Sequence, residues 1–251
     1  MTTLYLFAIS HYCEKARWGL DYLGIDHTLR ILGPGLHFVQ AQERGWPSSA
    51  LPVLETEAGF IQGSSAILDW AEAQGPAEGR LGAESPDDTE TRRSIEKRLD
   101  ERVGVHARRL YYSEAIVEYP ETVLPIFTQD LDPEEAAIVE SGWSGIRSRM
   151  MAMMDLGRAQ ADDSQGVIEA ELDWLDGLVS DGRRYLLGDS FGRADLTVAS
   201  LLAPLGSPAM RPRGGIPALP PRLAALSAGW EKRPIFERVR QNYREHRHPG
   251  R

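Results

Sequence analysis

The pattern of apolar and polar positions divides the chain into a first part that mixes strands with helices and a longer second part of helices alone. An apolar run at residues 3–9 predicts a buried strand, and apolar residues then recur at helical spacing down to Gly24, a typical helix stop. The other elements expected in this first part are strands at 27–32, 51–55 and 60–61, a short irregular or helical stretch up to Gly45, and a helix that begins at Ser64 or Ser65. The predicted order is therefore β-α-β-α-β-β-α.

After this α/β part the sequence has almost no strand signal. The stretch from residue 75 to residue 88 holds three glycines and two prolines, which indicates a linker. Helices are expected at 89–115, 134–157, 167–179, 192–205, 223–230 and 235–243, with a Pro- and Gly-rich loop at 207–221. Asp195 is placed to bond back to the start of its helix, as in a capping box. We predict an α/β domain at 1–76, a linker at 77–88 and an all-helical domain at 89–251.

Composition and charge exclude several classes of function. The 251 residues are 42% hydrophobic and 26% charged, which is typical of a soluble globular protein. A net charge of −9 argues against a nucleic-acid partner and against a surface attracted to anionic lipid. No apolar run approaches the ~18 residues of a membrane helix, and no basic stretch precedes the apolar start of the chain as in a secretory signal. We expect a cytoplasmic protein with no membrane partner.

Metal chemistry is not expected either. Cys13 is the single cysteine, so the chain has no intramolecular disulfide and no cysteine-based metal site. His246 and His248 near the chain end have no carboxylate or cysteine spaced to complete a metal site.

The strongest chemical signal is Ser10, at the junction of the first strand and the first helix. A helix start offers unpaired backbone N–H groups and the positive end of the helix dipole, which stabilise a thiolate or an oxyanion. A hydroxyl at the cap is well placed to donate a hydrogen bond to a bound thiolate and lower its pKa. The alternative is a serine that only caps the helix, which is the commoner use of this residue.

The segment from Ser10 to Cys13, Ser-His-Tyr-Cys, resembles the active-site motif of the glutathione transferase and glutaredoxin families. The resemblance places Ser10 at the position of the catalytic group and Tyr12 among the cofactor-binding residues. Cys13 is a second, weaker catalytic candidate, because it shares the helix stripe that must pack on the sheet, where a free cysteine usually acts as a small buried hydrophobe. A dithiol cycle is excluded because the partner thiol is missing.

Two further segments resemble the glutathione site of this family. Leu51-Pro52-Val53 is similar to the segment in which thioredoxin-like proteins have a cis-proline, whose preceding residue pairs with the backbone of the cysteinyl unit of glutathione. The bland alternative is a proline at the start of a strand. His37 lies in the loop that borders the tripeptide and is a candidate donor to the glycyl carboxylate, although a histidine in a polar loop is more often simply solvated.

Gln62-Gly63-Ser64-Ser65 looks like the acidic-Ser turn that holds the γ-glutamyl end of glutathione in the family. There the serine hydroxyl and the helix-start amides bind the carboxylate. Gly63 stands where the family has an acidic partner for the α-amino group, so Gln62 is the candidate substitute as a neutral acceptor. This departure leaves open whether the thiol is glutathione or a related molecule.

In the helical part, residues 185–189 and 192–196 are similar to the C-terminal signature of the family, where a capping turn starts a buried helix. Arg109 and Tyr112 are candidates for the pocket of the second substrate, against the alternative of a solvated basic face with an aromatic core contact. The methionines between 150 and 154 are expected to pack in the interior.

The resemblance implies a thioredoxin-like βαβαββα domain followed by a helical bundle. It also implies a glutathione S-transferase-like enzyme, a homodimer, that activates bound glutathione as a cosubstrate for attack on a small electrophile. The alternative is a non-catalytic protein of this fold that binds a ligand or another protein. A thiol-disulfide oxidoreductase working through Cys13 is a third possibility.

Overall fold

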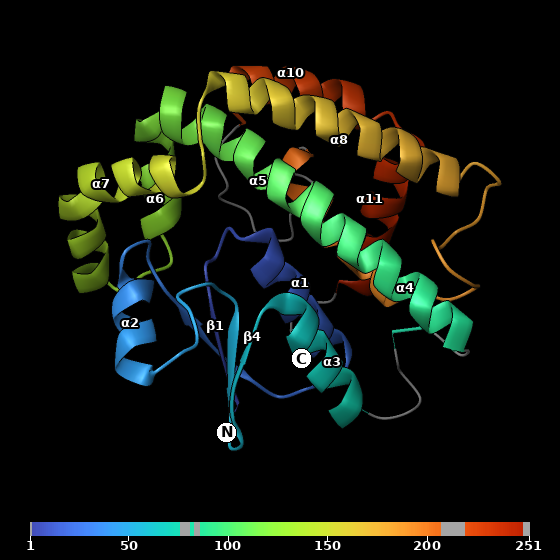
Figure 1. Ribbon diagram of the computed structural model, residues 1–251, viewed down its shortest axis with the longest axis horizontal. Helices are drawn as coiled ribbons and strands as arrows, with labels where there is room; N and C mark the ends of the chain where they lie inside the picture. The colour runs from blue at the N-terminus through green and yellow to red at the C-terminus, as the bar shows by residue number, and fades with distance from the viewer. Residues whose placement is uncertain (1, 76–80, 83–85, 207–218, 248–251) are drawn as a thin grey trace.

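The computed structural model describes residues 2–75, 81–82, 86–206 and 219–247. A four-stranded sheet with its helices forms one part of the molecule. The long helices of the second part lie above it in the view of Figure 1. The strands are β1 (Thr3–Leu6), β2 (Thr28–Ile31), β3 (Val53–Thr56) and β4 (Gly59–Gln62), and their order in the sheet is β2-β1-β3-β4. β1 pairs parallel with β2 and antiparallel with β3, and β4 pairs antiparallel with β3. The predicted βαβαββα order is confirmed.

Three helices cover this sheet: α1 (His11–Tyr22), α2 (Leu36–Arg44) and α3 (Ser64–Gln74). Alternate residues of β1 point to opposite faces, because the side-chain period of a strand is two. Leu4 and Leu6 join the main core, to which α1 and α3 contribute, whereas Tyr5 packs in a smaller cluster with Ala41 of α2 and Trp46. The sheet is therefore buried on both faces.

The second part has helices and loops but no strand among the residues described. Its elements are α4 (Pro86–Arg98), η1 (Leu99–Gly104), α5 (Val105–Tyr112), η2 (Ser113–Glu118), α6 (Pro120–Thr128), α7 (Pro133–Met153), α8 (Arg158–Leu178), α9 (Arg193–Leu202), η3 (Ala203–Leu205), α10 (Pro221–Trp230) and α11 (Pro234–His246). The first four form one long helical path, in which η1 and η2 are π-helical turns. This path crosses the molecule diagonally in Figure 1, directly above α1.

Helix α9 is the centre of the helical part, since every residue from Arg193 to Leu202 is buried. Its start is fixed as predicted: the two carboxylate oxygens of Asp195 accept hydrogen bonds from the backbone N–H groups of Leu186, at 2.8 Å, and Gly192, at 3.1 Å. Asp195 thus satisfies buried backbone donors at the turn that precedes the helix.

The element pattern of the sequence is confirmed with three main differences. Helix α8 begins at Arg158 and not at residue 167, and the other two concern α6 and α4. Helix α6 is not expected from the sequence, because Pro120 and Pro125 are signals of a helix break; Pro120 occupies the tolerated first turn, and Pro125 lies inside the helix. Helix α4 begins inside the predicted linker. The boundaries at 76 and 88 stay predictions, since residues 76–80 and 83–85 lie outside the described residues, as do His248 and residues 207–218 of the predicted loop.

Candidate active site

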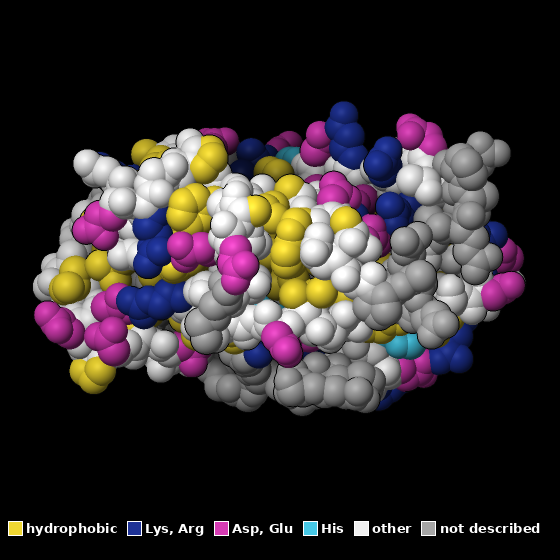
Figure 2. Space-filling view, turned by 90° about the horizontal axis from the view of Figure 1, so that it is seen from below, with side chains coloured by type: hydrophobic (Ala, Val, Ile, Leu, Met, Phe, Trp, Pro, Cys, Tyr) yellow, Lys and Arg dark blue, Asp and Glu magenta, His cyan; other side chains and the backbone are white. Residues whose placement is uncertain are grey.

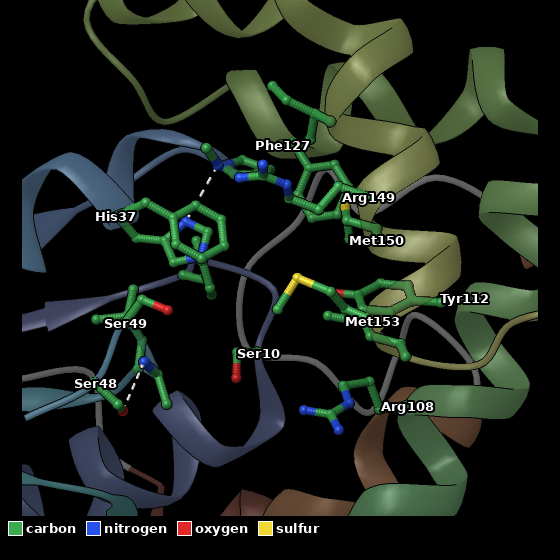
Figure 3. Close-up of a pocket in the computed structure, with 18 of the residues that line it drawn as sticks. Ser10, His37, Ser48, Ser49, Arg108, Tyr112, Phe127, Arg149, Met150 and Met153 are labelled. Carbon is green, nitrogen blue, oxygen red and sulfur yellow. Dashed lines mark hydrogen bonds between the residues drawn. The ribbon is translucent and has the colours of Figure 1, made fainter.

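A cavity of about 910 Å³ lies between the α/β part and the helical part. Its walls come from the start of α1, the loop and first turn of α2 at 34–39, the loop at 48–51, and helices α5, α6 and α7 (Figure 3). Of the residues singled out in the sequence, the cavity brings together Ser10, Tyr12, His37, Leu51 and Tyr112. They come from four separate segments of the chain, so the fold alone assembles them.

Ser10 is the N-cap of α1 and faces this cavity. Its backbone is extended, and its Oγ accepts a hydrogen bond from the N–H of Cys13 at 3.3 Å. That bond uses an oxygen lone pair. A side-chain hydrogen bond with Cys13 involves the hydroxyl as well, and a hydroxyl can rotate toward another partner. Ser10 therefore caps the helix, which was the alternative interpretation of the sequence. Its hydroxyl can also donate to a ligand at the positive end of a twelve-residue helix.

His11 and Tyr12 fasten the start of α1 to the turn η1. His11 Nε2 donates to the carbonyl of Gly104 at 2.8 Å, and Tyr12 Oη donates to the carbonyl of Asp100 at 2.6 Å. Burial lowers the pKa of His11 to about 3, so its ring is neutral at pH 7. A Cβ at Gly104 would lie 2.3 Å from Tyr12 Oη, so only glycine permits this approach. These contacts set the position of Ser10 relative to the helical part.

Cys13 is fully buried beneath this junction and does not line the cavity. Burial raises the pKa of its thiol to about 11, against the smaller opposing effect of the hydrogen bond with Ser10. A protonated, enclosed thiol is a poor nucleophile. This is the environment of a packing residue.

We expect Cys13 to resist iodoacetamide in the folded protein at pH 8, since alkylation needs an exposed thiolate. Mass spectrometry should show rapid modification only after denaturation, which serves as the control for reagent quality. Stoichiometric labelling of the folded protein within minutes would restore the oxidoreductase reading.

Leu51 and Pro52 are joined by a cis peptide bond, as the resemblance implies, and Leu51 lines the cavity. The side-chain amide of Gln62, which was expected to accept from the α-amino group of glutathione, has its N–H groups bonded within the protein. Its Nε2 donates to the carbonyls of Ser48, at 2.8 Å, and Ala50, at 2.7 Å, and so holds the loop that precedes Leu51. Gln62 shapes the cavity wall indirectly.

The turn at residues 63–65 lies outside the lining of the cavity. Gly63 has a φ of 95°, in the region that favours glycine, and a Cβ there would meet nothing within 4 Å. Ser64 begins α3 and is buried, and Ser65 is bonded to residues of the interior. Whether Gly63, Ser64 and Ser65 hold a ligand stays a prediction.

Ser65 belongs to a buried ionic cluster that the sequence did not indicate. Lys15 of α1 is fully buried, and its Nζ lies 2.8 Å from Glu96 Oε1, 2.8 Å from Asp100 Oδ1 and 3.0 Å from Ser65 Oγ. Ser65 Oγ in turn lies 2.8 Å from Asp100 Oδ2, to which it donates. The cluster joins α1 and α3 to α4 and η1, directly behind the start of α1.

Arg193 extends this cluster into the helical core. Its guanidinium contacts Glu96 at 2.9 Å, Asp69 at 2.6 Å and the carbonyl of Ser65 at 2.8 Å. Burial alone would raise the pKa of Glu96, but the ion pairs with Lys15 and Arg193 lower it, so the carboxylate stays charged. Residues from both parts of the chain thereby hold one another in place.

His37 stands on the wall opposite Ser10 (Figure 3). Its ring packs against Phe7 and Phe38, at centroid distances of 4.9 and 4.1 Å, and its Nδ1 accepts from the N–H of Gly35. Burial lowers its pKa to about 4, against the smaller opposing effect of a hydrogen bond with the backbone of Gly33, so the ring is neutral at pH 7. His37 can donate one hydrogen bond to a carboxylate but brings no charge to it.

The long helix contributes Tyr112 to the cavity, as expected, but Arg109 points elsewhere. Arg109 donates to Ser164 at 2.7 Å and pairs with Asp155 and Asp163 on the side of α8. The residue before it, Arg108, lines the cavity instead. Arg108 lies four positions before Tyr112, so the two side chains share one face of the helix. The helical pattern of the sequence did not distinguish these two arginines.

The remaining wall is apolar, formed by Phe127, Ile146, Met150, Met153 and Met154. Met150 and Met154 also pack against the main core, in accordance with the expectation for this cluster, but Met153 is two-thirds exposed. The methionines therefore form a surface toward the cavity as well. Such flexible, polarisable side chains adapt to apolar ligands of different shape.

Comparison with known proteins identifies the first part of the chain. Residues 4–79 match the family described as glutathione S-transferase, N-terminal domain. The chain has the fold of the glutathione S-transferase superfamily. No curated protein sequence matches this chain.

Solved structures superpose over nearly the whole chain. Beta-etherase LigF from Sphingobium sp. strain SYK-6 is 17% identical, with a TM-score of 0.61, and the match covers 96% of this chain and 99% of that one. A glutathione S-transferase from Methylobacillus flagellatus KT with glutathione bound is 18% identical, with a TM-score of 0.58 and coverage of 95% and 98%. One from Methylobacterium radiotolerans JCM 2831, in complex with glutathione sulfonate, is 22% identical, with a TM-score of 0.57 and coverage of 94% and 92%. At these identities the likeness establishes the fold.

Among the residues that the structure describes, no helix combines the length and the apolar character needed to cross a membrane. Within the same residues, no three His, Cys, Asp or Glu side chains are grouped so that they could hold a metal ion.

Proposed function

We propose that the protein is a glutathione S-transferase-like enzyme, which binds glutathione as a cosubstrate and uses its thiolate to attack a small apolar electrophile. The observation on which this rests is the position of Ser10: a rotatable hydroxyl at the start of α1 that faces a large and mainly apolar cavity. The hydroxyl and the helix dipole both favour a thiolate over a thiol.

The chain's own residues would act mainly by placement. Leu51, next to cis-Pro52, would pair its backbone with the cysteinyl unit. The other residues proposed to surround the tripeptide are Tyr12, Pro52, Ser64, Ser65 and the Gln62-Gly63 turn. His37 would donate to the glycyl carboxylate. The thiolate attacks the electrophilic carbon and the leaving group departs with the bonding electrons. Holding both reactants in one cavity supplies much of the acceleration.

The cavity wall suggests a test that uses S-alkyl glutathiones. If the sulfur lies at Ser10, its alkyl group enters the apolar space beside Tyr112 and Phe127, and each buried methylene adds about 0.8 kcal/mol, or roughly fourfold in affinity. We expect isothermal titration to show saturable binding of reduced glutathione and a rise in affinity from S-methyl through S-butyl to S-hexylglutathione.

Absence of saturable binding by reduced glutathione would contradict the proposal. S-hexylglutathione that binds no tighter than S-methylglutathione would show that the sulfur does not face the cavity. The second candidate, a non-catalytic binder of apolar ligands, is favoured by the lack of an acidic side chain at Gly63 and predicts that apolar molecules bind while glutathione does not. We also propose that the protein is cytoplasmic and forms a homodimer. Sedimentation analysis, which measures the mass of the particle in solution, tests the homodimer.

A further inference from the structure

The charges around the cavity are all of one sign. Its lining includes two arginines, Arg108 and Arg149, and no aspartate or glutamate among the described residues, in a protein with a net charge of −9. The two histidines of the lining, His11 and His37, are neutral at pH 7, because burial lowers both pKa values. The cavity is therefore a positive region inside an acidic protein.

The two arginines differ in their surroundings. Arg149 is exposed and lies over the ring of Phe38, with its Cζ 5.5 Å from the ring centroid. Arg108 is half-buried, and Figure 3 shows its guanidinium pointing from the long helix toward Ser10. Among the residues that the structure describes, it forms no hydrogen bond or ion pair, whereas the next residue, Arg109, is held by Asp155 and Asp163. A guanidinium next to an apolar wall, with no carboxylate beside it, is set for an anionic ligand.

We propose that the electrophilic substrate of this site is an apolar molecule with an anionic group, and that the anion pairs with Arg108 while the apolar body packs against Tyr112, Phe127 and Met153. This rests on the proposed function only in calling the ligand an electrophile; the preference for an apolar anion is a property of the cavity itself. Because Arg108 points toward Ser10, an anion held there places the rest of the molecule within reach of a thiolate at Ser10.

The selectivity has a simple physical basis. Arg108 offers five N–H donors in a planar fork that fits a carboxylate, and a neutral amide of the same shape gains no charge interaction. A hydrogen bond to a charged group contributes roughly tenfold or more in affinity over its neutral counterpart. The same site should therefore bind an acid more tightly than the amide of the same shape.

The test measures binding of 1-naphthylacetic acid and 1-naphthylacetamide to the full chain by isothermal titration at pH 7, without any thiol. We expect the acid to bind at least about tenfold more tightly than the amide. Arg108→Gln should reduce this ratio to about twofold or less, because it removes the charge and leaves a shorter, neutral polar side chain. Arg109→Gln, the matched control on the same helix, should leave the ratio unchanged.

Equal binding of acid and amide to the unaltered protein, or binding of neither, would overturn the proposal, as would a preference that survives in Arg108→Gln. A further arm adds saturating S-methylglutathione, which should leave the acid bound; competitive displacement would instead assign Arg108 to a carboxylate of glutathione. Failure of the proposed function is distinguishable, because a protein that prefers the acid but does not bind glutathione would keep this inference and lose the transferase activity.

Discussion

Lys15→Met is expected to lower the free energy of unfolding by about 3–5 kcal/mol, the cost of removing one partner from a buried ion pair. Lys15 is fully buried and contacts Glu96 and Asp100 at 2.8 Å. Methionine fills a similar volume but leaves Glu96 with Arg193 as its remaining cation and Asp100 without one among the described residues. Urea denaturation followed by circular dichroism measures the change.

Lys97→Met is the matched control, because Lys97 lies in the same region and its ion pair with Glu101, at 4.0 Å, is between exposed side chains. An exposed pair contributes about 0–1 kcal/mol, so this variant should unfold almost as the unaltered protein does. A loss for Lys15→Met no larger than that of the control would show that the cluster does not hold the two parts of the chain together.

Ser10→Ala is expected to lower kcat/KM for conjugation of glutathione by about 10²–10³-fold, the usual effect of removing one donor to a reacting anion. The side chain also caps α1, so the variant should lose about 1 kcal/mol of stability as well. Stopped-flow or steady-state assays with 1-chloro-2,4-dinitrobenzene measure the first effect, and urea denaturation measures the second.

Asp132→Ala separates the two effects, because Asp132 caps α7 by accepting from the N–H of Glu135 at 2.9 Å and is not part of the cavity lining. It should cost similar stability and leave kcat/KM within about twofold. If Ser10→Ala keeps as much activity as Asp132→Ala, the hydroxyl is a cap and no more.

Much of the fold could be predicted because local signals and tertiary structure agree. Ser10 begins a helix that ends before Gly24, Pro52 follows a cis bond, and Asp195 binds back to the start of α9. The two helix caps depend on residues close by in the chain, whereas the cis bond at Pro52 was expected from the family resemblance. Helix α6 was missed because Pro125 is tolerated inside it by its packing, which the sequence pattern does not contain.

The candidate site was predictable only where it coincides with such local signals. Arg108 and Arg109 have the same chemistry, but adjacent positions of a helix point in different directions, so that Arg108 lines the cavity and Arg109 pairs with Asp155 and Asp163. From the sequence alone, Lys15 is expected to be an ordinary exposed charge on a helix. The fold brings Glu96 and Asp100, more than eighty residues away, into contact with it. Long-range pairing of this kind has no pattern along the chain.

The central claim is that Ser10 stabilises a bound thiolate, and the pKa of bound glutathione tests it most directly. The ultraviolet absorbance of the thiolate, recorded from pH 5 to pH 10 with the protein in excess, gives that pKa. We predict a pKa below that of free glutathione in the unaltered protein, and a return toward the free value in Ser10→Ala. A bound thiol with the pKa of free glutathione in both proteins would contradict the account.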